Sequence, residues 1–459
     1  MTTDVAPAGV RGRYAPSPTG YLTVGNARTA LLAWLDVRSR GGSFVLRLDD
    51  TDVARETVAP DEIRADLDAL GLDWDEGWDV GGPCAPYATS ERAGRHRAVA
   101  DELLASGAAY WDYTPPIADV AAHKAGREGA KAGRSAHRGS SRQVEGVDPV
   151  LRLRVPADGA VEVHDRVFGA IRVDVADIAE VALMRADGRP TYHLASCVDD
   201  AEMGITSVVR GADWLNSLPQ HALVFRALGA DLPEFAHVPL LVGADGQKLS
   251  KRQGDLSIRH LLDDEGVPGG ALCAYLANLG FAERTDLEAL AEMANGFDLA
   301  LLGKASPRYD PKKLEALSRR WLAECESPER LAAELRSRAG IELTEEQVRV
   351  LVEGVRTRIP TFAAAGALAG FLGIDDRGGR DVAVLDDDLV AALLGTRPWE
   401  VGALAAAIDA AVPAGPDRKA SLGALRDALA PGLRVTPPLH VMLAALGRER
   451  SAARLAPGA

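Results

Sequence analysis

A loop rich in lysine is one stretch of this sequence whose residues could do chemistry. In DGQKLSKRQG (Asp245–Gly254), two lysines and an arginine flank a serine, and glycines bound the loop. Lys248 and Lys251 could follow negative charge as it develops on a leaving pyrophosphate, which is electrostatic stabilisation of a transition state. An isolated K-x-x-K run is more commonly a solvated charged turn, so the chemical interpretation needs a second element.

The second element is a loop near the N-terminus that joins a predicted strand to a predicted helix. In RYAPSPTGYLTVGNARTAL (residues 13–31), prolines and glycines precede an Ala- and Leu-rich run. The backbone N–H groups at a helix start lack partners and the helix dipole is positive there, so the position suits an anion such as a phosphate. Glycines allow close backbone approach, although a glycine turn at such a place also serves packing alone.

The elements that must position these loops alternate between strands and helices. RGRYAPS and GGSFVLRLDD are typical of strands, whereas NARTALLAWLDVRSR and APDEIRADLDALGL are typical of helices. The second helix has Pro60 in its first turn and Gly71 after its end, as helices prefer. This β-α-β-α order implies a parallel sheet with crossover helices.

The rest of the chain shows two further patterns. Short strand-like runs separated by turns (PVLRLRV, AVEVHD and GAIRVDV) indicate an inserted lobe near residues 105–190. SVVRGADWL and HVPLLV then return to the alternation of strands and helices. From about residue 310 onward the pattern is helical and rich in Ala, Leu, Arg and Glu.

The net charge of −14 over 459 residues argues weakly against a nucleic-acid-binding protein. The argument is weak because a local basic patch can bind nucleic acid on an acidic protein. One candidate patch consists of basic residues spaced three or four positions apart. These residues would share one face if the segment is a helix, and they would otherwise lie in a basic loop. Contact with a phosphate backbone and a solvated surface both stay open for its residues, which are Lys124, Arg127, Lys131, Arg134, Arg138 and Arg142.

The four cysteines form no C-x-x-C pair, which disfavours a zinc site or a disulfide framework. We expect Cys84, Cys197, Cys273 and Cys325 to be small buried side chains. No apolar run is long enough to span a bilayer, and the first residues lack the apolar core of a secretory signal. A cytoplasmic location is therefore the expectation.

Together the two loops resemble the paired signatures of class I aminoacyl-tRNA synthetases. APSPTGYLTVGNART resembles the first signature and KLSKR the second, in the right order and more than two hundred residues apart. FVLRLDDTD, GLDWDEG, RPTYHLASCVDDAEMGITSVVRGADWL and ALCAYLANLGF narrow the resemblance to glutamyl-tRNA synthetase. LRVTPPLHVMLAALGRERSAARL is similar to the last helices of that family, so the resemblance covers essentially the whole chain.

The resemblance implies an α/β Rossmann-type catalytic domain with an inserted acceptor-binding lobe, followed by an all-α anticodon-binding domain. The expected division has five parts: the first half of the catalytic domain (1–104), the inserted lobe (105–190), the second half of the catalytic domain (191–250), the lysine loop with a stem-contact region (251–310) and the helical domain (311–459).

The resemblance also implies roles for particular residues. The residues expected to bind ATP are Pro16, Thr23, Gly25, Asn26, Lys248, Ser250 and Lys251, with Lys251 and Lys248 catalytic. The residues expected to bind glutamate are Arg13, Ala15, Ser17, Asp49, Tyr192, Ser196 and Arg210. A dicarboxylate needs fixed cationic groups, and an arginine can bind a carboxylate with two parallel hydrogen bonds. Arg356 and Arg358 are expected to contact tRNA.

The implied activity is that of a glutamate–tRNA ligase, which is an enzyme. It would use ATP and Mg²⁺, hold no structural zinc, and act as a monomer on L-glutamate and tRNA-Glu, with tRNA-Gln as a second candidate. Little covalent chemistry falls to such a protein, because positioning and charge stabilisation carry the reaction. The alternatives are a specialised or weakened paralogue that serves a dedicated tRNA pool, and a silent tRNA-binding protein.

Several positions depart from the family's usual pattern and motivate those alternatives. Thr23 stands where the first signature usually has a histidine that helps to hold ATP phosphate. Asp49 replaces a Glu and Ser196 a frequent Asn, while Ala88 and Thr89 occupy places where Arg and Gln are common. The loss of one charge-assisted hydrogen bond of about 1.5–3 kcal/mol would slow activation roughly ten- to a few hundred-fold.

Overall fold

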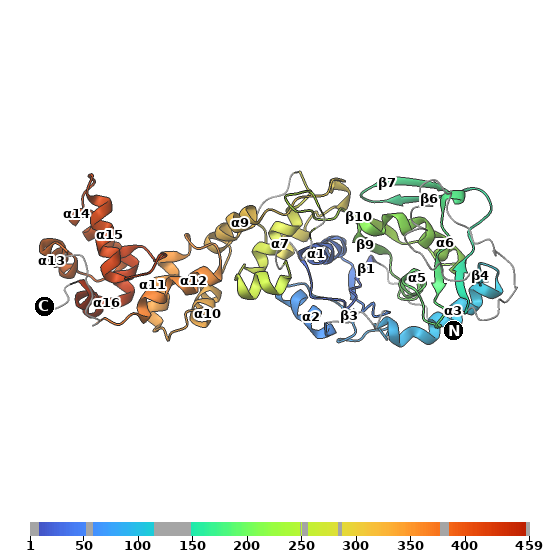
Figure 1. The fold of residues 1–459 in the computed structure, drawn as a ribbon, viewed down its shortest axis with the longest axis horizontal. Coiled ribbons are helices and arrows are strands. Elements are labelled where there is room, and N and C mark those ends of the chain that lie inside the picture. The colour runs from blue at the N-terminus through green and yellow to red at the C-terminus, as the bar shows by residue number, and fades with distance from the viewer. Residues whose placement is uncertain are drawn as a thin grey trace. The chain divides into compact units, whose positions relative to one another are not determined.

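A computed structural model shows that the chain folds as two compact units (Figure 1). Unit 1 comprises residues 1–259 and 276–309, and unit 2 comprises residues 260–275 and 310–459. The finer five-part division stays a prediction. The candidate basic patch lies outside the residues that the structure describes, which are 9–51, 58–113, 148–247, 249, 256–282, 287–376 and 385–455.

Unit 1 is built on a seven-stranded sheet in the order β3-β2-β1-β9-β10-β6-β7. Its first five strands run parallel to their neighbours, with Arg13 of β1 opposite Val45 of β2 and Val209 of β9 opposite Ala236 of β10. The predicted parallel sheet is therefore confirmed. Its strands are β1 (Arg11–Tyr14), β2 (Ser43–Leu46), β3 (Glu76–Gly77), β9 (Ser207–Gly211) and β10 (Glu234–Val238).

The strand order reverses between β1 and β9, because the chain builds β2 and β3 on one side of β1 and returns to place β9 on the other. In open parallel sheets, ligands bind at the carboxyl ends of the strands at such a switch point. Tyr14 and Gly211, the last residues of β1 and β9, mark this place. The topology thus selects one edge of the sheet for the site.

The first helix packs closely on the sheet. In the central strand β1, a Cβ at Gly12 would lie only 2.4 Å from Val37 Cγ2 of α1, so glycine permits this close approach. The expected second helix, α2, has Pro60 as its first residue and is followed by Gly71 with φ of +76°, as its sequence predicts. The helices of this part are α1 (Val24–Ser39), α2 (Pro60–Ala69), α3 (Ala93–Ala105), α5 (Tyr192–Glu202) and α6 (Leu218–Leu228).

The segment expected as an inserted lobe contributes to two sheets. β4 (Ala109–Asp112), β5 (Val150–Leu153) and β8 (Ala182–Met184) form a separate antiparallel sheet. The hairpin of β6 (Ala160–Asp165) and β7 (Gly169–Asp174) instead extends the main sheet, where Asp165 pairs with Phe235 of β10. The hairpin therefore brings Asp165 to the main sheet.

HVPLLV contributes only its first two residues to a strand, because β10 ends at Val238. Pro239 follows directly, and a proline cannot donate a hydrogen bond to a ladder.

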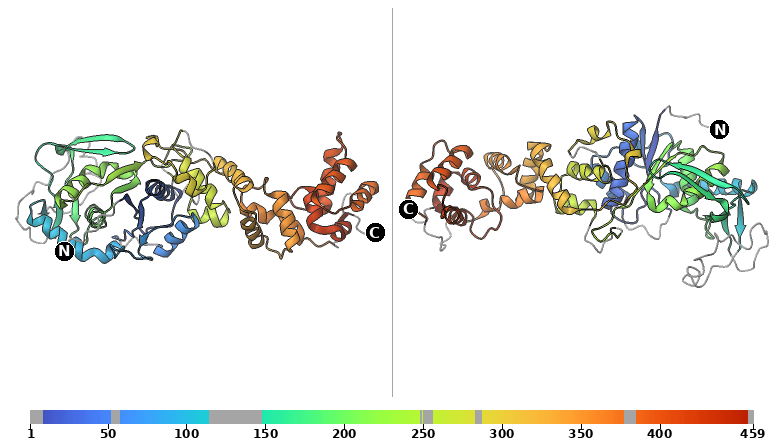
Figure 2. Two further views of the ribbon diagram at one scale, coloured as in Figure 1. Left: turned by 180° about the vertical axis from the view of Figure 1, so that it is seen from behind. Right: turned by 90° about the horizontal axis from the view of Figure 1, so that it is seen from above.

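Unit 2 is helical in its described residues, as the pattern after residue 310 predicts (Figure 2). Side-chain oxygens of Asp310, Ser327, Thr344, Thr361 and Asp386 cap five of its helices. Leu, Val and Ala side chains of these helices form one continuous core. The helices are α9 (Pro311–Glu324), α10 (Pro328–Arg338), α11 (Glu345–Val355), α12 (Phe362–Leu368), α13 (Asp387–Gly395), α14 (Val401–Ala411), α15 (Arg418–Leu429) and α16 (Leu439–Leu455).

Three more helices are described between residues 260 and 294. A π-helix covers His260–Asp264 and α8 covers Leu290–Ala294, while α7 (Gly269–Asn278) begins in unit 2 and ends in unit 1. Among the helices described here, none combines the length and the apolar character needed to cross a membrane.

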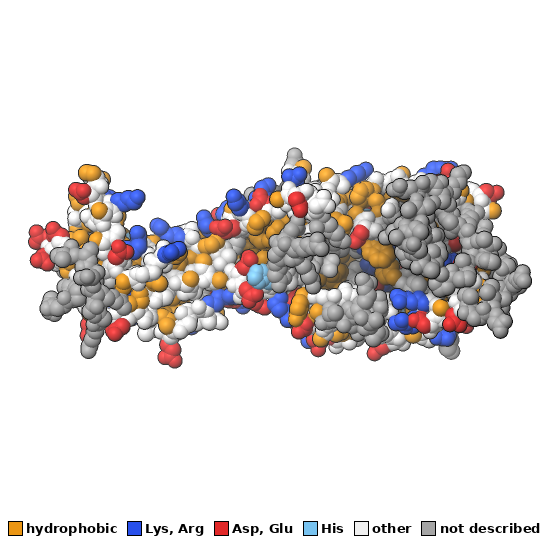
Figure 3. Space-filling view, in the orientation of Figure 1, with side chains coloured by type: hydrophobic (Ala, Val, Ile, Leu, Met, Phe, Trp, Pro, Cys, Tyr) orange, Lys and Arg blue, Asp and Glu red, His pale blue; other side chains and the backbone are white. Residues whose placement is uncertain are grey.

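The surface carries charges of both signs. On the face shown in Figure 3, Lys and Arg side chains and Asp and Glu side chains are both spread over unit 2, with hydrophobic side chains between them. The acidic excess of the chain therefore leaves cationic side chains at the surface of this unit.

The cysteines do not all behave as expected. Cys197 and Cys273 are buried and none of the four forms a disulfide, but Cys84 is only half-buried and Cys325 is exposed. The expectation of four buried cysteines is wrong at Cys325 because this residue follows the last turn of α9, where the chain leaves the helix at the surface.

A glycine in α7 gives a test of packing in unit 2. A Cβ at Gly270 would lie 2.1 Å from Cζ2 of the buried Trp321, so Gly270→Ala must displace that ring. We expect this variant to lose about 1–3 kcal/mol of unfolding free energy in chemical denaturation. Gly423→Ala in α15 is the matched control, because a Cβ there meets no atom within 4 Å. A loss in Gly270→Ala no greater than in the control would contradict the packing shown here.

Candidate functional site

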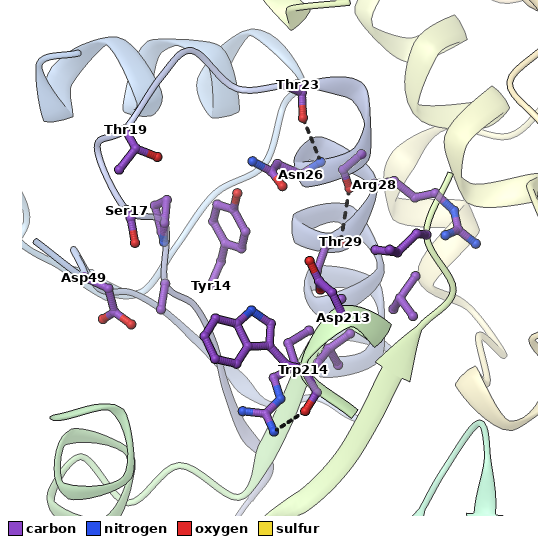
Figure 4. A pocket seen from close by; sticks show the side chains of 18 of the residues that line it. Tyr14, Ser17, Thr19, Thr23, Asn26, Arg28, Thr29, Asp49, Asp213 and Trp214 are labelled. Carbon is purple, nitrogen blue, oxygen red and sulfur yellow. Dashed lines mark hydrogen bonds between the residues drawn. The ribbon is translucent and has the colours of Figure 1, made fainter. Parts of the chain in front are cut away.

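A cavity of about 1000 Å³ lies at the switch point of the main sheet (Figure 4). Its lining comes from the end of β1, the loop after it, the start of α1, the segment after β2, and the segment after β9. Most of the expected ATP- and glutamate-binding residues meet here, although they are far apart in sequence. Those that line the cavity are Arg13, Ala15, Pro16, Ser17, Thr23, Gly25, Asn26, Asp49, Tyr192 and Arg210.

One expected residue lies elsewhere. Ser196 does not line the cavity and is only 3% exposed, and its Oγ accepts a long hydrogen bond (3.5 Å) from Arg47 Nη2. In this structure Ser196 therefore contacts Arg47 and does not line the cavity itself. The expected residues Lys248, Ser250 and Lys251 lie outside the described residues.

The start of α1 forms the end of the cavity that suits a phosphate. Thr23 is the N-cap of this helix, and its Oγ accepts from the backbone N–H of Asn26 (3.4 Å). A Cβ at Gly25 would meet nothing closer than Thr23 Oγ1 at 3.9 Å, so the missing side chain leaves open space at the helix start. In Figure 4, Thr23 and Asn26 lie together at this helix start.

The structure joins the lysine loop to this helix start. Thr23 and Ser257 form an isolated β-bridge, and the N–H of Val24 donates to the carbonyl of Leu256 (3.0 Å). Leu249 and Leu256, one within and one directly after the lysine loop, both line the cavity. The two signature segments of the sequence therefore meet at one end of one cavity.

The other end of the cavity is a network of buried charges. Arg13 donates to both oxygens of Asp200 (3.0 and 3.3 Å), and Arg47 donates to Asp200 Oδ1 (2.6 Å) and to Asp49 Oδ1 (2.9 Å). Burial opposes the charged form of Asp200, but the attraction of Arg13 and Arg47 outweighs it and lowers the pKa of this carboxyl. Asp200 already engages the Nε–Nη2 edge of Arg13, so a ligand would approach Nη1.

Asp49 is a buried acid in the lining of the cavity. Its Oδ1 accepts from Arg47, and the Thr89 hydroxyl lies 3.1 Å from it. Its Oδ2 is buried and has no hydrogen-bond partner among the described residues. Burial raises the pKa of Asp49, although Arg47 opposes the rise. An orphaned carboxylate oxygen of this kind can accept a hydrogen bond from an ammonium group.

Arg210 lies on the opposite side of the switch point, at the end of β9. Its guanidinium donates to His237, to His221 and to the carbonyl of Trp214, and it is buried. The Tyr192 ring packs against the Trp214 ring with centroids 4.3 Å apart. In Figure 4, Trp214 and Asp213 lie across the cavity from Thr23.

The sequence motifs alone missed several residues that organise this site. Arg47, Asp200, His221 and His237 contact expected ligand-binding residues, although none was singled out. The adjacent Asp199 and Asp200 gave the best available signal, because two neighbouring acids must find cationic partners when both are buried.

The two arginines expected to contact tRNA differ in their surroundings. Arg356 donates to the carbonyl oxygens of Leu322 and Glu326 at the C-terminal end of α9, which is a structural role. Arg358 is exposed on the surface of unit 2. Their expected contact with tRNA stays a prediction, and Arg358 is the more accessible of the two.

A family model described as tRNA synthetases class I (E and Q), catalytic domain, matches residues 9–316, which include every residue of the cavity. The chain belongs to this family. The fold class expected from the sequence is thereby confirmed, and the cavity coincides with the catalytic domain of a class I tRNA synthetase.

Similar proteins cover nearly the whole chain. A Methylobacterium radiotolerans protein named glutamate–tRNA ligase 1 is 37% identical over 96% of this chain and 97% of its own length. A Rhizorhabdus wittichii protein named glutamate–tRNA ligase 2 is 38% identical over 96% of both. The solved structure of a glutamate tRNA ligase from Elizabethkingia meningosepticum, in complex with its amino acid, matches with a TM-score of 0.81 and 27% identity over 97% of this chain and 98% of that one.

The buried histidines of this synthetase make its stability depend on pH. Burial lowers the pKa of His221 well below its usual value, with further lowering by the facing groups Arg210, His193, Arg13 and His237. An unfolded histidine binds a proton below about pH 6.5 whereas folded His221 does not, so the unfolding free energy must fall as the pH drops below that value.

Between pH 7.5 and 5.5, we expect the unfolding free energy of His221→Gln to fall by about 1 kcal/mol less than that of the unaltered protein, because the variant lacks the titrating group. Urea unfolding of both proteins at pH 7.5, 6.5 and 5.5 measures the effect. The lowered pKa values of Asp199 and Asp200 keep these carboxylates outside that pH window. Parallel pH profiles for the two proteins would contradict the expectation.

Proposed function

We propose that this chain is a glutamate–tRNA ligase that converts L-glutamate and ATP to glutamyl-adenylate and transfers the glutamyl group to the 3′ end of tRNA. The observation that carries the proposal is the composition of the cavity. One end holds an open helix start beside the lysine loop, and the other holds Arg13, Arg210 and the buried carboxyl group of Asp49. Relatives of nearly the same length are named for this activity.

The glutamate end of the cavity provides a partner for each charged group of the amino acid. The free Oδ2 of Asp49 would accept from the ammonium group. Arg13 Nη1 and the Arg210 guanidinium would bind the carboxylates, because Asp200 leaves Arg13 Nη1 available. Asp49 is one methylene shorter than the usual Glu, and Arg47 and Thr89 fix its Oδ1.

The phosphate end of the cavity supports the chemical step. An oxygen of the glutamate α-carboxylate attacks the α-phosphorus of ATP, and pyrophosphate leaves with the bonding electron pair. The open N-terminus of α1 and the lysines of the adjacent loop would stabilise the phosphate charge, with Lys251 as the principal contact and Lys248 in support. A terminal ribose hydroxyl of tRNA then attacks the acyl carbon, and AMP leaves.

The described residues bring no three His, Cys, Asp or Glu side chains together as ligands for a metal ion. We therefore assign Mg²⁺ no protein ligands here and derive no step through it. The lack of structural zinc stays a prediction, as do the monomeric state and the cytoplasmic location. The proposed nucleic-acid partner is tRNA-Glu, with tRNA-Gln as a second substrate to be tested.

Charging of tRNA transcripts tests the proposed activity directly. With labelled L-glutamate, ATP and magnesium, the protein should attach label to tRNA-Glu, and label on tRNA-Gln would identify a non-discriminating enzyme. Lys251→Ala should lower kcat about a hundred-fold or more while the thermal unfolding curve is unchanged. Lys312→Ala, at an exposed position of α9, is the control. Near wild-type charging by folded Lys251→Ala would count against the proposal.

Asp49 provides a test of the glutamate end. Asp49→Asn replaces an acceptor with an amide that cannot neutralise an ammonium group, so KM for L-glutamate should rise about ten- to a hundred-fold in the charging assay. Asp68→Asn is the control, because this exposed residue of α2 does not line the cavity. Equal effects of the two variants on KM would remove Asp49 from the proposed role.

A further inference from the structure

Arg210 is held by partners of a different kind from those that hold Arg13. Its Nε donates to His237 Nε2 (2.9 Å) and its Nη1 donates to His221 Nδ1 (3.0 Å). A longer bond joins Nη2 to the carbonyl oxygen of Trp214 (3.4 Å). Within the described ranges, Arg210 has no ion pair with a carboxylate, whereas Arg13 is paired with Asp200.

The direction of these hydrogen bonds assigns the protons on the histidines. A guanidinium group can only donate, so His237 Nε2 and His221 Nδ1 must both be unprotonated acceptors. His237 therefore carries its proton on Nδ1, which donates to Asp165 Oδ2 (2.7 Å). His221 carries its proton on Nε2, which donates to His193 Nδ1 (3.1 Å). Each ring is thus neutral in this arrangement.

The surroundings of the rings favour the same neutral forms. Burial, followed by the charge of Arg210, lowers the pKa of His221 and of His193. Burial also lowers the pKa of His237, although the hydrogen bond to Asp165 opposes this. His221 and His237 are almost fully buried, so no water competes for Arg210 at these two positions.

The carboxylate of Asp165 is separated from Arg210 by the His237 ring. Its oxygens accept from His237 Nδ1 and from the backbone N–H groups of Val167 (2.9 Å), Phe168 (2.8 Å) and His237 (3.1 Å). Its charge is therefore shared by four donors from the β6–β7 hairpin and β10. Asp165 fixes the orientation of His237 without contacting the guanidinium.

Arg210 therefore keeps both its charge and part of its hydrogen-bonding capacity for the cavity. A guanidinium group has five N–H bonds, and the contacts of Arg210 engage one each on Nε, Nη1 and Nη2. One N–H remains on each terminal nitrogen, which is the pattern that binds a carboxylate through two parallel hydrogen bonds. Arg210 lines the cavity together with Tyr192 and Trp214.

We propose that His221 and His237 are positioning residues that fix Arg210 through neutral acceptors, leave its positive charge uncompensated, and thereby make the cavity select the side-chain carboxylate of glutamate over the amide of glutamine. The inference rests on the proposed function, because it takes L-glutamate as the substrate. A carboxylate in the place of either ring would orient Arg210 equally well but would neutralise it. An anionic ligand gains from an uncompensated cation, whereas a neutral amide gains much less.

Two substitutions of one residue separate orientation from charge. His221→Gln keeps a neutral acceptor beside Arg210, whereas His221→Glu supplies a charged one of similar reach. The assay is charging of tRNA-Glu by the complete chain, with KM for L-glutamate, kcat and the inhibition constant of L-glutamine as readouts. We expect His221→Glu to raise KM for L-glutamate about ten- to a hundred-fold, with less than about a threefold change in the glutamine constant. His221→Gln should change the ratio of the two constants less than about threefold.

The outcomes distinguish the inference from the proposed function. Equal changes in the glutamate and glutamine constants, or equal changes in the two variants, would show that His221 only supports the fold and would overturn the inference. If thermal unfolding shows that His221→Glu does not fold, the shorter His221→Asp makes the same comparison. A lack of glutamate charging by the unaltered chain would overturn the proposed function and the inference with it.

Discussion

The cavity depends on one buried carboxylate, that of Asp200, which lies between two buried guanidinium groups. Arg13 of β1 and Arg47, directly after β2, donate to it from 187 and 153 residues away in the sequence. One side chain of α5 thereby fastens two neighbouring strands at their carboxyl ends. Removing one partner from such a buried pair costs about 3–5 kcal/mol, because the remaining charge has no water to solvate it. Through Arg47, the same carboxylate also fixes Asp49.

The two sides of the glutamate end differ in how their charge is balanced. Around Arg13, each guanidinium group has a carboxylate in contact, so this side holds its shape and carries little net charge. Around Arg210, imidazoles take the place of carboxylates and the positive charge remains. A rigid, balanced wall opposite one uncompensated cation is an arrangement suited to a substrate that has a single extra negative charge. Desolvation strengthens the contrast, because charges in a buried cavity are poorly screened.

The phosphate end is organised by the backbone more than by side chains. Thr23 caps α1 and pairs with Ser257, so the residue that replaces the usual histidine holds the helix start against the chain that follows the lysine loop. The space beside Gly25 is kept open in the same turn. Threonine is among the residues that favour the N-cap position, because its short hydroxyl reaches a backbone N–H in the first turn. Thr23 thus has a structural reason to be present that does not depend on ATP.

The sequence by itself determined the features that depend on local chemistry. Strand and helix alternation and Pro60 at a helix start follow from neighbouring residues and predicted the parallel sheet, whereas the resemblance to the synthetase family supplied most of the residues of the cavity. Only the tertiary structure decided which partner each side chain meets. Ser196 lies behind the cavity and Cys325 at the surface, and the partner of Arg13 comes from a distant helix. The physical reason is that helical and strand periodicities act over a few residues, whereas a buried charge is satisfied by whatever group the fold brings beside it.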